Sequence, residues 1–308
     1  MQLHPRAPVL ARRGGAVQVG LTSPAVLRGL GSAERAFLAS LEGGRPVSPI
    51  QARRFSRLVS RLTNAGAWWD APVETPPFTV AVHGCGRLGM AIAAALADAG
   101  CDVALVDDAS QAVEEAGLFP AASGEVPATC AGGAAGALAA RGVRVRVGGS
   151  AALAVVTCLG SPDPTVVAEL MRTDTPHVLV VCGESDAWVS HMIVPGVSAC
   201  SRCRDLALSR DDDEWPLVSL QLSSPGQTGR RPFASDAARP VIAGLVCAAV
   251  GRWRGAGAIG AGYRVNDSGA FWPEPIAADP QCGCGAPPRQ GSVPGDDLED
   301  VRAVGLEL

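Results

Sequence analysis

Lysine is absent from this sequence of 308 residues, so all 26 basic residues are arginine. A reaction step that needs a lysine ammonium or a lysine nucleophile therefore cannot be carried by this chain. The sequence also has no run approaching about 18 apolar residues and no apolar signal core after Met1–Arg6. We therefore expect a cytoplasmic protein with no membrane partner. A net charge of -4 provides no global basic field, so nucleic acid is not an expected partner.

Ten cysteines are present, and in a reducing compartment they favour metal ligation or burial over a disulfide framework. Four of them form two close pairs, Cys200 with Cys203 and Cys282 with Cys284. Four thiolates form a closed tetrahedral shell without an open position for water, which predicts one structural zinc ion. Two disulfides, four unrelated thiols and iron–sulfur ligation are the alternatives. The isolated cysteines are predicted to be buried as small hydrophobic residues: Cys101, Cys130, Cys158, Cys182 and Cys247.

The first 70 residues show a short strand at Val17–Leu21 and two helical patterns. The first helix opens at Ser32 and stops at Gly43, and the second runs from Ser48 through Thr63. A further short strand is predicted at Ala67–Trp69. This order predicts a small winged-helix-like domain over 1–70. Three prolines in 71–77 predict an extended linker and a domain boundary.

Strand and helix patterns alternate after the linker. They predict an α/β fold, with a Rossmann-like, mostly parallel sheet and helices on both faces, over 78–285. The predicted elements are Thr79–His83, Leu88–Ala99, Val103–Val106, Gly132–Ala140, Val143–Val147, Ala152–Cys158, Thr165–Met171 and His177–Val181. The segment 286–308 contains the acidic run Asp296–Asp300 and is predicted to be a loosely ordered tail.

A G-x-G-x-x-G motif lies between the first of these strands and its helix. Gly84 permits a tight turn, Gly86 lets a phosphate group approach the backbone, and Gly89 allows close packing of helix on strand. Asp107, with Asp108 as the neighbouring alternative, follows the next strand where a carboxylate would accept hydrogen bonds from ribose hydroxyls. The alternative is a loop that keeps the turn of the fold without binding a nucleotide. His83 and Cys85 are interpreted as packing or loop residues.

The glycine loop, the acidic strand end and the Pro195-Gly-x-x-x-Cys-x-x-Cys203 segment occur here in the order typical of a known family. The chain resembles ThiF-like members of the ubiquitin-activating-type adenylyltransferases. It is most similar to the ThiF-like leader-peptide-binding partners of azoline-forming cyclodehydratases, from about Leu3 to Gly285. The resemblance implies a peptide-recognition role for the N-terminal domain, a zinc site that includes a late Cys-x-Cys, and a homodimer paired through the sheet domain. In such proteins the peptide adds a strand beside the wing, and the corresponding edge here is expected near Val17–Leu21.

The chain departs from the adenylating members of this family at several positions. Arg87 stands where they have a glycine, the stretch after Asp107 has no arginine, and their ATP-contacting lysine has no counterpart. Where they have a later aspartate, this chain reads Gly160-Ser-Pro-Asp163. Because such cations and a magnesium ion stabilise charge on the α-phosphate, we expect a scaffold that binds a peptide or partner protein, with no catalytic residue assigned. The first alternative is an ATP- and Mg²⁺-dependent adenylyltransferase in which Arg87 or Arg141 supplies the missing charge. A nicotinamide-dependent oxidoreductase ranks last, because it leaves the cysteine pairs unexplained.

Overall fold

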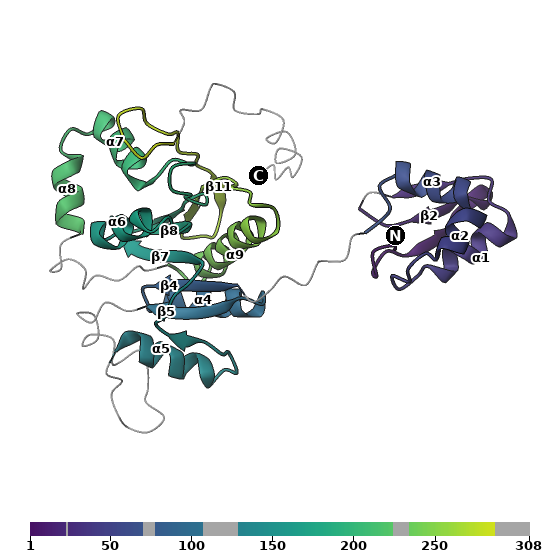
Figure 1. Ribbon diagram of the computed structural model, residues 1–308, viewed down its shortest axis with the longest axis horizontal. Helices are drawn as coiled ribbons and strands as arrows, with labels where there is room; N and C mark the ends of the chain where they lie inside the picture. Colours follow the sequence, from purple (N-terminus) through teal and green to yellow (C-terminus); the bar gives the residue numbers. More distant parts are fainter. Residues whose placement is uncertain (23, 70–77, 107–128, 224–233, 287–308) are drawn as a thin grey trace. The chain divides into compact units, whose positions relative to one another are not determined.

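The computed structural model of the chain describes residues 1–22, 24–69, 78–106, 129–223 and 234–286 (Figure 1). The chain divides into two compact units, Met1–Glu74 and Thr75–Leu308. The predicted linker 71–77, Asp107 and the predicted tail beyond Ala286 all lie outside the described residues.

The N-terminal unit combines a three-stranded antiparallel sheet, in the order β1-β2-β3, with three helices. Its core joins residues of β2 and β3 to the inner faces of α1 and α3, including Val17, Leu27, Leu38 and Leu62. The elements are β1 Val9–Ala11, a 3-10 turn Arg13–Gly15, β2 Val17–Val19, β3 Ala25–Leu27, α1 Ser32–Ser40, α2 Pro49–Arg54 and α3 Ser56–Asn64.

The position of β2 corrects one expectation. Val17–Val19 is the central strand, hydrogen-bonded to β1 on one side and to β3 on the other. The prediction that a peptide strand adds near Val17–Leu21 is therefore wrong, because both edges of β2 are already paired. The flanking strands have three residues each, too few to show an alternating pattern in the sequence.

Two further expectations for this unit differ from the structure. The second predicted helix is broken at Phe55, where the backbone leaves helical geometry (φ -109°, ψ 31°). The Phe55 ring there stacks on Phe37 at a centroid distance of 4.4 Å, so tertiary packing coincides with the break. Trp68 forms only an isolated bridge with Leu3 in place of a strand.

The C-terminal unit is a mixed α/β fold built on an eight-stranded sheet in the order β11-β10-β9-β8-β7-β4-β5-β6. The pairs from β8 to β6 are parallel, and those from β8 to β11 are antiparallel. The strands are β4 Thr79–His83, β5 Asp102–Val106, β6 Arg146–Val147, β7 Leu153–Leu159, β8 His177–Cys182, β9 Asp186–Val189, β10 Tyr263–Asn266 and β11 Phe271–Pro273.

Helices cover both faces of this sheet, which confirms the predicted α/β architecture (Figure 1). In β4, Val80 and Val82 pack into a core with α4, α5 and α9, whereas Ala81 between them packs into a second core with α6 and α7. This alternation is the period of two expected for a strand buried on both faces. The helices are α4 Arg87–Asp98, α5 Cys130–Ala139, α6 Pro164–Arg172, α7 Ser201–Asp211, α8 Trp215–Leu222 and α9 Ala238–Ala256.

The predicted strand Val143–Val147 is shorter than expected. Only Arg146 and Val147 pair, with β5. The backbone N–H of Val143 donates to Leu138 O and so still belongs to the end of α5, which delays the start of the strand. No helix among the described residues has both the length and the apolar character needed to cross a membrane.

Candidate metal centre

The first cysteine pair lies at the start of α7. Cys200 precedes the helix in an extended conformation, and Cys203 lies in its first turn. A turn leads into this segment, because the backbone N–H groups of Val197 and Ser198 both donate to Val194 O. The spacing of three residues places the two thiols on one side of the helix start.

The second pair lies in the loop after β11. Asp279 shapes this loop, because its carboxylate accepts from the Gln281 N–H at 2.8 Å and its carbonyl accepts from the Cys282 N–H at 3.0 Å. Gly283 and Gly285 have φ values of 72° and 79°, in the left-handed region that favours glycine. A sharply curled backbone thus brings Cys282 and Cys284 to the first pair.

All four sulfur atoms converge within 4.8 Å of one another. The Sγ atoms are 4.0 Å apart for Cys200 and Cys203, 3.4 Å for Cys200 and Cys282, and 3.7 Å for Cys203 and Cys284. A tetrahedral ion with Zn–S bonds of about 2.3 Å requires sulfur atoms about 3.8 Å apart, so this donor set fits one zinc ion. A disulfide needs about 2.05 Å, and all ten cysteines, which lie in the described residues, are free thiols. The disulfide alternative is therefore wrong.

The surroundings of the quartet suit a closed structural site. Cys200, Cys203 and Cys282 are buried, and Cys284 is half-buried. Burial raises the pKa of Cys200 to about 11 and also raises that of Cys282. Without a metal these two thiols are protonated at neutral pH, so binding of an ion must release their protons. The backbone N–H of Asp279 also donates to Cys203 Sγ at 3.4 Å, the type of outer contact that orients a metal ligand.

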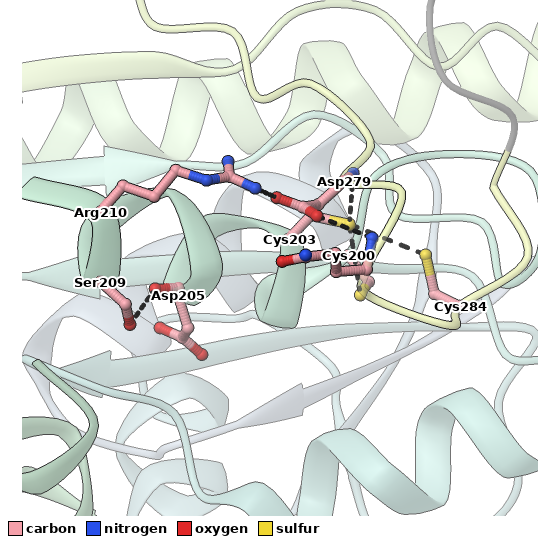
Figure 2. Close-up of polar contacts among 8 residues, drawn as sticks. Cys200, Cys203, Asp205, Ser209, Arg210, Asp279 and Cys284 are labelled. Carbon is pink, nitrogen blue, oxygen red and sulfur yellow. Dashed lines mark hydrogen bonds and ion pairs between the residues drawn. The ribbon is translucent and has the colours of Figure 1, made fainter. Parts of the chain in front are cut away.

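Asp279 also links the two cysteine segments through Arg210, which lies near the end of α7 (Figure 2). The Asp279 side chain is 3% exposed and the Arg210 side chain is 57% exposed, so the carboxylate is the buried partner. The hydrogen bond from the Gln281 N–H and, to a smaller extent, the contact with Arg210 hold the pKa of Asp279 below its usual value. Sequence reasoning did not single out Asp279, although an Asp three residues before a cysteine pair is a turn signal.

Aromatic contacts fix α7 against the sheet. The Arg204 guanidinium lies 4.9 Å from the ring centroid of Trp188 on β9 and 5.9 Å from that of Trp215 on α8. Trp215 Nε1 donates to Asp205 at 3.1 Å. These contacts fix the position of α7, the helix that carries Cys203, against β9.

The glycine loop lies at the carboxyl end of β4, as its motif predicts. Gly84 follows the strand with φ 90°, Gly86 immediately precedes α4, and Gly89 lies in the first turn of that helix. A Cβ atom at Gly84 would overlap Thr157 Oγ1 of β7, and one at Gly89 would overlap Gly84 O. Packing inside the protein therefore requires glycine at both positions, whether or not a ligand binds.

The neighbours of the loop are structural. Cys85 is buried and its thiol donates to Val106 O at 3.4 Å, and His83 is half-buried with a pKa lowered by desolvation and by His177. Asp163 caps α6, because its carboxylate accepts from the Thr165 N–H at 2.8 Å. Among the isolated cysteines, burial raises the pKa of Cys182 to about 12 and also raises that of Cys158.

Comparison with known proteins shows the fold. No protein-family model matches the sequence, and no curated protein matches it. The structure of the heterocyclase TruD matches with a TM-score of 0.58 at 15% identity, over 92% of this chain and 42% of TruD. E. coli MccB, solved with MccA, matches with a TM-score of 0.56 at 16% identity, over 92% of this chain and 98% of MccB. The chain therefore spans less than half of TruD and nearly all of MccB, and it shares their fold.

Proposed function

We propose that this chain is a ThiF-like scaffold that binds a peptide or partner protein through a winged-helix-like N-terminal unit, without adenylation activity. A zinc ion held by Cys200, Cys203, Cys282 and Cys284 would clamp α7 to the loop after β11 and supply no reactive position. The fold relatives support a peptide partner, since E. coli MccB was solved with MccA and a heterocyclase with its substrate. Ten free thiols favour a reducing compartment, so a cytoplasmic location is part of the proposal, as is a homodimer paired through the sheet unit.

The observation that carries the proposal is that, in the part of the chain that the structure describes, no strand pairs with the outer edge of β3. Arg12 N donates to Ala16 O and Gly20 N donates to Pro8 O, so the main-chain N–H and C=O groups of even-numbered residues in and beside β2 point toward β1. The main-chain groups of the odd-numbered residues then point toward β3, in the register Val17 opposite Leu27. Val26 lies between the bonded positions, and its N–H and C=O point away from β2 toward the free edge. A peptide strand can therefore pair at Val26.

The other outer strand is less available. The Val9 N–H on β1 already donates to the Glu42 carboxylate at 3.1 Å. We therefore place the peptide at β3, which replaces the edge near Val17–Leu21.

The test is binding to the full chain, measured by calorimetry with precursor peptides encoded beside its gene. Val26→Pro removes the outward N–H while leaving the β2–β3 bonds in place, and it should weaken binding about tenfold. Val26→Ala keeps the N–H and serves as the matched control. Equal affinity for both variants, or no binding of any such peptide by the parent, would contradict the proposal.

Adenylation is the second candidate function, favoured by one observation: E. coli MccB was also solved with ATP. In this chain Gly84, Gly86 and Gly89 would hold the nucleotide phosphates, Asp107 would hold the ribose, and Arg87 at the start of α4 would replace a missing cation. Against it stand the absence of lysine, the capping role of Asp163 and the packing roles of Gly84 and Gly89. Pyrophosphate exchange with ATP and magnesium decides between the two functions, and we expect none.

A further inference from the structure

Charge is divided very unequally between the two units. Residues 1–74 contain ten arginines and four acidic residues, a formal charge of +6, while residues 75–308 contain 16 arginines and 26 acidic residues, a charge of -10. The overall charge of -4 conceals this difference. The small unit is therefore strongly basic although the protein as a whole is acidic.

The two carboxylates in the described part of the small unit do not neutralise its arginines. Glu34 accepts from the Gly31 N–H at 2.8 Å and so caps α1, and Glu42 accepts from the Val9 N–H. None of the ion pairs between described residues involves an arginine of residues 1–69. The arginines of this unit thus have no ion-pair partner among the described residues.

Five of these arginines gather at one end of the three-stranded sheet, which we call the arginine end: Arg12, Arg13, Arg28, Arg35 and Arg61. Arg12 and Arg13 lie in the β1–β2 turn, and Arg28 follows β3, whose Leu27 pairs with Val17 just after that turn. Arg35 donates to Gly15 O in the same turn, and Arg61 Nη2 donates to Arg28 O at 3.1 Å. All five residues are exposed.

The arginine end adjoins the open edge of β3. The carbonyl of Arg28, two residues after Val26 and just beyond the end of β3, accepts from Arg61 of α3. Arg57 lies one turn earlier on the same face of α3 and is also exposed. A chain paired at Val26 would therefore run beside guanidinium groups.

We propose that the ligand of the N-terminal unit is an acidic peptide, extended along β3, whose Asp and Glu side chains contact the arginine end. This inference rests on the proposed function and adds the chemical class of the ligand. Guanidinium groups bind carboxylates through paired, charge-assisted hydrogen bonds, and the strand edge supplies main-chain bonds that only a polypeptide can match.

The test selects ligands from a random library of 16-residue peptides displayed on phage, with the full chain as bait. Peptides recovered by the parent should have a mean charge well below that of the input library. The double variant Arg12→Glu with Arg28→Glu reverses the charge of two side chains. No hydrogen bond of either side chain is found among the described residues, so folding should be retained. The matched control is Arg6→Glu with Arg45→Glu, which are exposed residues at the opposite end of the sheet, where Pro5 adjoins Gly44.

For the tightest acidic peptide, calorimetry should show affinity lowered about tenfold by the first double variant and less than about twofold by the control. Raising salt from about 50 to 500 mM should also weaken binding to the parent. Recovery of peptides without acidic bias would overturn this inference and leave peptide binding intact. Recovery of no peptide would overturn both, as would binding only to a 20-base-pair DNA duplex that depends on Arg12 and Arg28.

Discussion

The cysteine quartet and the glycine loop lie in the same unit, yet their residues have different explanations. Thiols from segments about 80 residues apart converge on one point, and no disulfide joins the four side chains. At the glycine loop, by contrast, contacts with Thr157 and with the loop backbone already explain Gly84 and Gly89. A metal is thus the simplest account of the quartet, whereas the loop motif by itself is weak support for a nucleotide.

The largest expected effect tests the quartet. Cys203→Ser removes one of four ligands and should release zinc and lower the free energy of unfolding by about 3–5 kcal/mol. Metal analysis and thermal unfolding of the purified protein measure both. Cys247→Ser, at a half-buried cysteine in α9 outside the quartet, is the control and should keep the metal. Unchanged metal content and melting temperature in Cys203→Ser would show that the quartet holds no ion.

A smaller effect tests whether packing alone requires the loop glycines. Gly89→Ala should destabilise the protein by about 2–3 kcal/mol in the absence of any nucleotide, because the new methyl group overlaps Gly84 O. Gly136→Ala in α5 is the matched control, since its Cβ would meet no atom within 4 Å. This control should stabilise the protein by up to about 1 kcal/mol. Denaturant unfolding measures both, and a neutral Gly89→Ala would remove the contrast between the two regions.

The smallest expected effect sharpens the account of the quartet. Asp279→Ala removes the carboxylate that orders the loop of the second pair, and zinc should then transfer to a chelator about tenfold faster. Arg210→Gln, which removes only the exposed partner of Asp279, should change that rate less than about threefold. A chromogenic chelator follows the release. If Arg210→Gln releases zinc as fast as Asp279→Ala, the ion pair and not the turn holds the loop.

Sequence reasoning succeeded where a signal was local. The spacing of Cys200 and Cys203, the strand Thr79–His83 and the turn at Gly84 each depend on neighbours within a few residues, and each is found as expected. It failed for strands of three residues, which made the central strand β2 look like an edge. It also missed the basic N-terminal unit, because a single net charge averages over both units.

Composition and spacing identified the two cysteine pairs and the absence of lysine before any fold was known, because both are properties of the chain itself. Only the folded chain showed that the sulfur atoms of both pairs meet within 4.8 Å, because segments about 80 residues apart are brought together by the sheet and α7, not by local preference. That no described strand pairs with the outer edge of β3 likewise depends on strand order, which no short segment encodes.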